Sequence, residues 1–146
     1  MKKLIILVTI AFSTFFMIPC AFAQSPIVGV WELAELQLGK SSQPPPVEIT
    51  NKKDIYTQDG HYHNTAPDST EMTDVELRSY EVKDGVVTIY RSNGAKQLEG
   101  KIVFRSPNFM EITDKKGTVI GFKKISDDPQ VIPRVEENKI RVKYTE

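Results

Sequence analysis

The stretch QLEGKIVFR at residues 97–105 decides the fold, because apolar and polar side chains alternate along it. One side of an extended backbone would carry Leu98, Gly100, Ile102 and Phe104. The other side would carry Gln97, Glu99, Lys101 and Arg105, with Val103 as the exception to the pattern. Alternation with a period of two predicts an antiparallel strand with one buried and one wet face.

Similar short stretches fill most of the chain on either side of this strand. Expected strands cover residues 28–36, 53–57, 61–65, 77–82, 86–91, 96–105, 109–114 and 118–125. Turns between them are marked by Asp59-Gly60, Asp84-Gly85, Asn93-Gly94 and Lys116-Gly117. These pairs suit tight hairpins because Gly accepts a positive φ. Strands joined in sequence form an up-and-down meander, and closure removes its edges, so we predict an all-β, eight-stranded antiparallel barrel.

Three segments depart from the pattern. Residues 39–46 contain consecutive prolines, which lack the N–H that a central strand needs, so a long loop is expected there. Residues 66–73 place Asp68 and Glu71 close to capping-box spacing, which predicts one helical turn. The tail, residues 127–146, alternates again over 139–144, which indicates either a ninth strand outside the barrel or an edge that pairs with a partner.

The N-terminus has the features of a signal peptide. Two lysines follow Met1, an apolar stretch covers residues 4–18, and Ala21 and Ala23 supply small residues for cleavage after Ala23. Pro19 ends the apolar run short of the roughly 20 residues of a spanning helix, which argues against a membrane anchor. A lipoprotein anchored through Cys20 is the other alternative, but Pro19 does not fit the small residue expected before a lipidated cysteine. We therefore expect a periplasmic or secreted protein.

Composition limits what the exported chain can do. Cleavage would leave 123 of the 146 residues, enough for one domain, with a barrel at 24–126 and an extension at 127–146. Losing Lys2 and Lys3 from 19 basic residues leaves 17 against 19 acidic ones, a net charge of −2. That balance favours neither nucleic acid nor anionic lipid. Cys20, the sole cysteine, would be removed, which excludes thiol catalysis and thiolate zinc sites.

Two further motifs resemble those of small bacterial lipocalin-like domains. Gly29-Val30-Trp31 is similar to that family's Gly-x-Trp element, and residues 56–62 (YTQDGHY) resemble its aromatic hairpin around an Asp-Gly turn. The resemblance covers residues 27–125 and implies an eight-stranded barrel whose floor is closed by the Trp. It also implies a small apolar ligand inside the barrel. In that family an arginine covers the Trp, and no arginine of this sequence can be assigned to the same role over Trp31.

Aromatic residues are the candidate ligand-binding side chains. Tyr56 and Tyr62 would face each other if residues 58–60 form a three-residue loop with Gly60 in the left-handed region. The full candidate set is Trp31, Tyr56, Tyr62, Tyr80, Tyr90, Phe104 and Phe122. The alternative for all of them is ordinary core packing.

His61 and His63 are the candidate metal ligands. They stand two residues apart, so on a strand both point to the same side, where a third ligand would complete a Cu or Zn site. Asp54, Asp59 and Glu71 are the nearest candidates along the chain. The alternative is a pair of exposed histidines beside a hairpin turn.

Catalytic motifs are absent from the sequence. It has no Gly-x-Ser-x-Gly elbow, no phosphate-binding glycine loop and no His-Glu-x-x-His zinc helix, so no enzyme activity and no cofactor is expected. Three functions remain open. The first is a barrel that binds a small apolar molecule. The second is an envelope protein-binding module of inhibitor or immunity type, using the Pro-rich loop, residues 66–73 or the C-terminal strand. The third is a metal-handling protein using His61 and His63.

Overall fold

A computed structural model describes residues 24–39, 52–134 and 140–144. The expected signal peptide with Cys20, most of the Pro-rich loop and part of the C-terminal tail lie outside these residues. Within them, no helix is long and apolar enough to cross a membrane.

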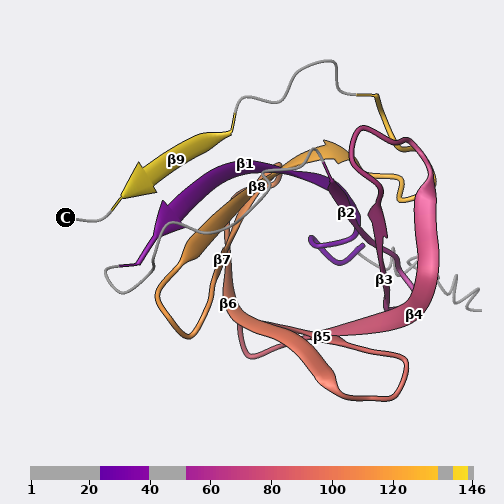
Figure 1. The fold of residues 1–146 in the computed structure, drawn as a ribbon, viewed down its shortest axis with the longest axis horizontal. Helices are drawn as coiled ribbons and strands as arrows, with labels where there is room; N and C mark the ends of the chain where they lie inside the picture. The colour runs from indigo at the N-terminus through magenta and orange to yellow at the C-terminus, as the bar shows by residue number, and fades with distance from the viewer. Residues whose placement is uncertain (1–23, 40–51, 135–139, 145–146) are drawn as a thin grey trace, which may run out of the picture.

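The described chain is all β, and eight strands form a closed ring (Figure 1). The strands are β1 (Gly29–Leu38), β2 (Lys53–Tyr56), β3 (His61–Thr65), β4 (Met72–Lys83), β5 (Val86–Tyr90), β6 (Lys96–Ser106), β7 (Phe109–Thr113) and β8 (Val119–Ser126), followed by β9 (Arg141–Tyr144). Each strand from β2 to β8 pairs antiparallel with the next, and β1 pairs antiparallel with both β8 and β2. The predicted eight-stranded up-and-down barrel is confirmed.

Glycine turns connect the hairpins as expected. Gly60, Gly85, Gly94 and Gly117 all have positive φ, between 74° and 85°. Asp84 also lies in the left-handed region, with φ 52°, which gives the two-residue turn between β4 and β5 the backbone twist that its strands require. In the hairpin from β2 to β3, Thr57 N donates to His61 O, so residues 58–60 form the predicted three-residue loop.

The helical turn predicted over residues 66–73 is wrong. Residues 67–68 form a turn, and β4 already begins at Met72. Asp68 has φ 56°, a left-handed conformation that a right-handed helical turn cannot include. The backbone N–H of Glu71 donates to Ser69 Oγ, a local bond that supports a bend in place of a helix cap.

The same part of β4 carries a large irregularity. Between the pairs Tyr62–Arg78 and Asn64–Thr73, β3 advances by two residues while β4 advances by five. The extra residues leave the ladder, and Leu77 among them is 62% exposed. Bulges of this kind bend a strand and strengthen its twist, and β4 is strongly curved in Figure 1.

One end of the barrel is closed by the N-terminal turn. Val28 N donates to Ser25 O, and the turn places the buried Ile27 in the hydrophobic core. Trp31 Nε1 donates to the Ile27 carbonyl at 2.7 Å and is itself fully buried. Residues 24–28 curl inside the ring in Figure 1. We refer to this end as the closed end.

The core lies inside the barrel, on the inner faces of all eight strands. Its fully or nearly buried members are Ile27, Trp31, Tyr56, Tyr62, Val87, Ile89, Ile102, Met110, Ile112 and Phe122, with Leu33, Tyr80, Phe104 and Ile120 packed against them. The face predicted for the strand at 97–105 is correct for Gly100, Ile102 and Phe104. Leu98 shares that face but is 38% exposed, because it lies near the end of the strand.

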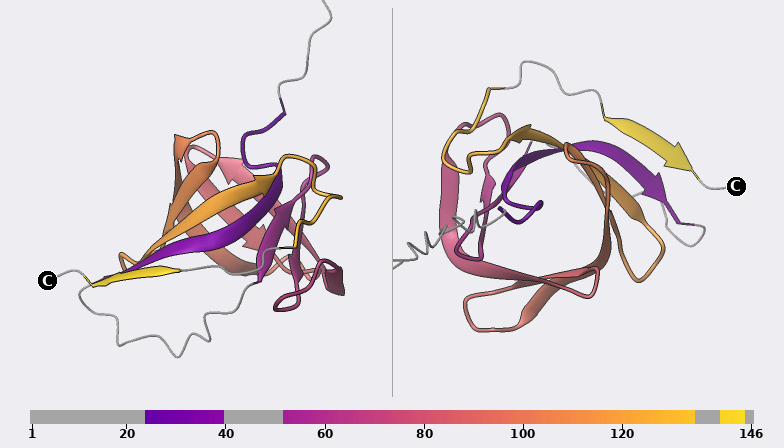
Figure 2. Two further views of the ribbon diagram at one scale, coloured as in Figure 1. Left: turned by 90° about the horizontal axis from the view of Figure 1, so that it is seen from above. Right: turned by 180° about the vertical axis from the view of Figure 1, so that it is seen from behind.

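Strand β9 lies outside the ring, parallel to β1 (Figure 2). The first half of β1 pairs with β2 and its second half, from Glu35 to Leu38, pairs with β9. Glu35 is 3.6 Å from Arg141 and 3.5 Å from Lys143, nitrogen to oxygen. The ninth strand predicted outside the barrel is therefore present.

Candidate ligand site

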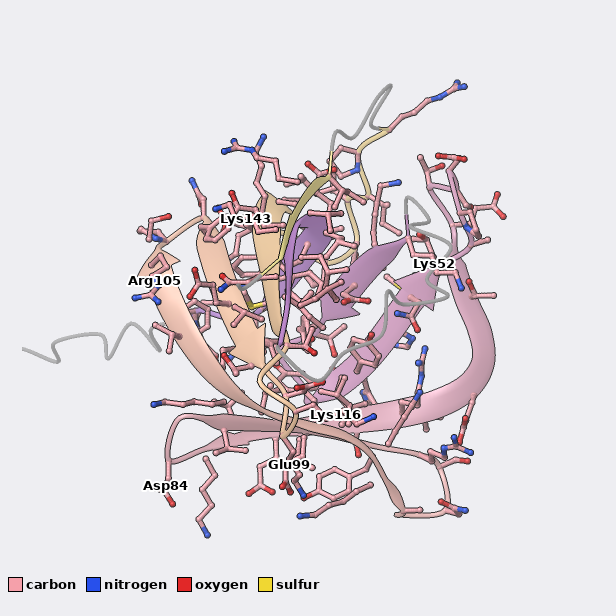
Figure 3. The ribbon with its side chains drawn as sticks, turned by 60° about the vertical axis from the view of Figure 1, so that its left-hand side comes forward. Lys52, Asp84, Glu99, Arg105, Lys116 and Lys143 are labelled. Atoms are coloured by element: carbon pink, nitrogen blue, oxygen red, sulfur yellow. The ribbon has the colours of Figure 1, made fainter. Side chains whose placement is uncertain are left out.

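A cleft of about 400 Å³ lies between the start of β2, the end of β3 and the first half of β4. These strand ends belong to the barrel end opposite the closed end. The side chains that define the cleft are Lys52, Asn64, Thr65, Thr73, Glu76 and Arg78, and residues 66–67 complete its wall. Lys52 lies beside the curved β4 (Figure 3). The β4 irregularity therefore shapes one side of the cleft.

A network of inward-facing polar groups reaches the cleft through Asn64 and Arg78. Asp54 Oδ1 accepts hydrogen bonds from Tyr62 Oη at 2.8 Å and from Asn64 Nδ2 at 2.7 Å. Asn64 Nδ2 is also 2.8 Å from Tyr62 Oη, and Asn64 Oδ1 accepts from Arg78 Nη2. Cross-strand pairing explains the arrangement, because Asp54 opposes Asn64 and Tyr62 opposes Arg78. The network therefore joins β2, β3 and β4.

Arg78 is the cationic member of this network. Its guanidinium carbon lies 4.7 Å from the centre of the Tyr62 ring, within cation–π range. Its Nε is buried and has no hydrogen-bond partner among the described residues. Buried polar groups are nearly always paired in folded proteins, so an orphaned guanidinium N–H calls for an explanation.

Burial controls the ionisation of the neighbouring groups. It raises the pKa of Asp54 above its usual value, and the hydrogen bonds from Tyr62 and Asn64 and the charge of Arg78 partly offset that rise. Burial, followed by the nearby Asp54, holds the pKa values of Tyr56 and Tyr62 well above 10. Both phenols therefore stay neutral hydrogen-bond donors at physiological pH.

Most of the predicted aromatic residues gather in the core. The Tyr56 ring centre lies 5.1 Å from those of both Tyr62 and Tyr80, which confirms the expected pairing of Tyr56 with Tyr62. Trp31 and Phe104 lie 6.3 Å apart, centre to centre, and Phe122 belongs to the same core. Tyr90 is apart from them, because it pairs with Ser79 on the outer face and its hydroxyl is exposed.

His61 and His63 lie side by side, with ring centres 6.3 Å apart. His61 Nδ1 is 2.9 Å from Asp59 Oδ2 in the adjoining turn. Asp54 takes part instead in the inner network. Within the described ranges, no group of three His, Cys, Asp or Glu side chains is arranged to hold a metal ion.

Sequence reasoning missed the polar side of the barrel interior. Asp54 and Asn64 stand two residues from Tyr56 and Tyr62, so the alternation already places them on the inner face. Lys124 was missed as well. Its Nζ lies 4.9 Å from the centre of the Trp31 ring.

A second cleft, of about 420 Å³, lies at the same end between β6 and the turn from β7 to β8. Glu99 and Lys116 mark it in Figure 3. Glu99 pairs with Lys96 and lies 3.0 Å from Lys115, and both lysine side chains are largely exposed. Two lysines thus compensate the charge of Glu99, and the lysine side chains are solvated, which makes this cleft a weaker ligand site than the one beside Arg78.

No protein family, curated protein or solved structure matches the chain. The structure itself defines the class: a closed, eight-stranded antiparallel β-barrel with an extra strand outside the ring.

Proposed function

We propose that this chain is an exported, lipocalin-like protein that binds a small molecule in the cleft beside Arg78. The observation that carries the proposal is the contrast between the two barrel ends. Ile27, Trp31 and Lys124 close one end, whereas the cleft of about 400 Å³ lies at the other. Pockets of about 300 to 1,000 Å³ are typical of small-molecule sites, and eight-stranded barrels can hold one small ligand.

The lining indicates what the ligand must offer. The resemblance to lipocalin-like domains implies an apolar molecule, and Ala66 and Pro67 in the cleft wall supply apolar contact. Lys52, Asn64, Glu76 and Arg78 add polar groups on the other sides. A ligand with an apolar body and a polar group fits this lining better than a hydrocarbon does.

Native mass spectrometry of the protein isolated gently from cells tests the proposal. We expect a small molecule that is retained in the native spectrum and lost on unfolding, on a chain whose mass shows cleavage after Ala23. Thr73→Phe should reduce the bound fraction, because Thr73 lines the cleft. Ser79→Phe is the matched control, since Ser79 is exposed on the same strand and faces outward. Equal occupancy in both variants would place the ligand elsewhere.

A second candidate function is a protein-binding module of inhibitor or immunity type. It is favoured by β9, which ends the strand order and exposes Arg141, Val142 and Lys143. An edge strand can accept a partner's strand through main-chain hydrogen bonds. Removing residues 135–146 should abolish binding of such a partner, whereas Thr73→Phe should leave it unchanged.

A further inference from the structure

We propose that Arg78 anchors a carboxylate, so that the cleft selects small organic acids over neutral molecules of the same shape. This inference rests on the proposed function, because it names the chemical class of the ligand for the same cleft. Its starting point is the guanidinium, which lines the cleft and carries a buried Nε for which the described part of the chain offers no hydrogen-bond partner.

The contacts of Arg78 leave its positive charge available to a ligand. Its Nη2 donates to Asn64 Oδ1, a neutral amide oxygen, and its guanidinium lies over the neutral ring of Tyr62. Burying a charged donor without an acceptor is costly. An anion held against the guanidinium from the cleft would compensate its partly buried charge, so the arrangement favours a bound anion over a neutral group.

The carboxylates near Arg78 are already engaged elsewhere. Asp54 Oδ1 accepts hydrogen bonds from Tyr62 and Asn64. Asp54 and Arg78 also attract each other electrostatically, although no hydrogen bond joins them directly among the described contacts. Glu76 accepts from both the backbone N–H and the hydroxyl of Ser92, each at 3.1 Å. Those two bonds direct Glu76 toward the turn between β5 and β6. The two cations of the cleft, Arg78 and Lys52, therefore face a ligand with only part of their charge compensated.

The same charges favour a monoanion over a phosphate. Glu76 lines the cleft, and bonds to Ser92 hold its pKa below the usual value, so it stays ionised and would repel a second negative charge. A planar guanidinium presents parallel N–H groups that match the two oxygens of a carboxylate. Ala66 and Pro67 offer an apolar wall for the rest of a small acid.

Paired probes that differ only in the anionic group test the inference on the full chain. Isothermal titration calorimetry would compare benzoate with benzamide and hexanoate with hexanamide. We expect at least one acid to bind ten times more tightly than its amide. Arg78→Gln should abolish that preference, and Arg78→Lys should reduce it, because Lys keeps the charge but loses the planar fork. Arg105→Gln, which removes an exposed arginine paired with Glu111, is the matched control.

The outcomes separate this inference from the function on which it rests. A neutral co-purified ligand whose occupancy falls in Thr73→Phe would support the binding barrel and overturn the carboxylate anchor. A preference for acids that persists in Arg78→Gln, or equal binding of both acids and their amides, would also overturn it. If Arg78→Gln fails to fold, the Arg78→Lys variant tests the inference instead. An acid-over-amide preference that is undiminished in Arg78→Lys would exclude a role for the guanidinium fork.

Discussion

The Lys124 ammonium lies 4.9 Å from the centre of the Trp31 ring, and both side chains donate hydrogen bonds to the N-terminal turn. Lys124 Nζ reaches the Val28 carbonyl at 3.0 Å, and its side chain is 8% exposed. Lys124→Met should lower the free energy of unfolding by about 2 kcal/mol, because a shielded cation–π contact and a charged hydrogen bond are lost. Urea unfolding measures this loss. Lys123→Met, at the exposed neighbouring position, should change stability little, and equal effects of the two variants would refute the assignment.

Trp31 is the sole tryptophan and one of the largest fully buried side chains. Trp31→Ala should lower the free energy of unfolding by about 3 to 5 kcal/mol, because it leaves a cavity beside Ile27 and Phe104. Thermal unfolding monitored by far-ultraviolet circular dichroism checks this expectation. An unchanged melting temperature would contradict the placement of Trp31 in the core.

Much of the fold could be predicted from the sequence because its signals are local. The alternation of apolar and polar residues predicts where the strands lie. The Gly-containing turns predict their order, because each hairpin places two consecutive strands side by side. The facing of Tyr56 and Tyr62 followed from the three-residue loop between them. Closure followed from the number of strands, because an open meander would leave two edges unpaired.

The parts that could not be predicted depend on contacts between distant residues. Lys124 reaches Trp31 only because β1 and β8 pair in a register that brings these two residues together. Alternation from Tyr80 would place Arg78 on the inner face, but its contact with Asn64 depends on the extra residues that β4 accommodates before Arg78, which the sequence does not reveal. The end of β3 and the start of β4 pair directly across residues 66–71, which overrides the capping-box spacing of Asp68 and Glu71.

Gly29 precedes Trp31 for a steric reason. Its φ is 136°, and a Cβ at this position would lie 2.4 Å from the Ser126 carbonyl oxygen. Gly29→Ala should therefore destabilise the barrel by about 2 to 4 kcal/mol, through backbone strain and displacement of β8. Gly94→Ala separates the two causes, because φ is 79° there but nothing lies within 4 Å of a Cβ. It should cost only about 1 kcal/mol. Equal losses in urea unfolding would show that the contact with Ser126 does not matter.

Asp54 should make stability fall as pH rises. Its folded pKa is raised above the unfolded value of about 3.9, so the folded state binds the proton more tightly. Its favourable contribution is complete below about pH 3.9 and is lost as pH rises through the folded pKa. Asp54→Asn removes this dependence, so the variant should gain stability relative to the natural protein as pH rises. Urea unfolding at several pH values measures the trend.

Asp59 provides a control of opposite sign. Hydrogen bonds from Thr57 and His61 lower its pKa, so its contribution is present above the unfolded value of about 3.9 and is lost as pH falls through the folded pKa. Asp59→Asn should therefore lose stability relative to the natural protein as pH rises through this range. Parallel trends for Asp54→Asn and Asp59→Asn would contradict the burial of Asp54.

Strand β9 should be dispensable for the barrel. It pairs with β1 alone, and the ring closes through β1, β2 and β8 without it. Its two ion pairs with Glu35 involve side chains that are 76% and 59% exposed, and such pairs contribute about 0 to 1 kcal/mol each. A chain ending at Arg134 should therefore keep its β-sheet circular dichroism and lose less than about 2 kcal/mol of stability. Hydrogen exchange should show faster exchange in the second half of β1, because truncation exposes the edge that β9 covers. Global unfolding of the truncated chain would instead make β9 part of the cooperative core.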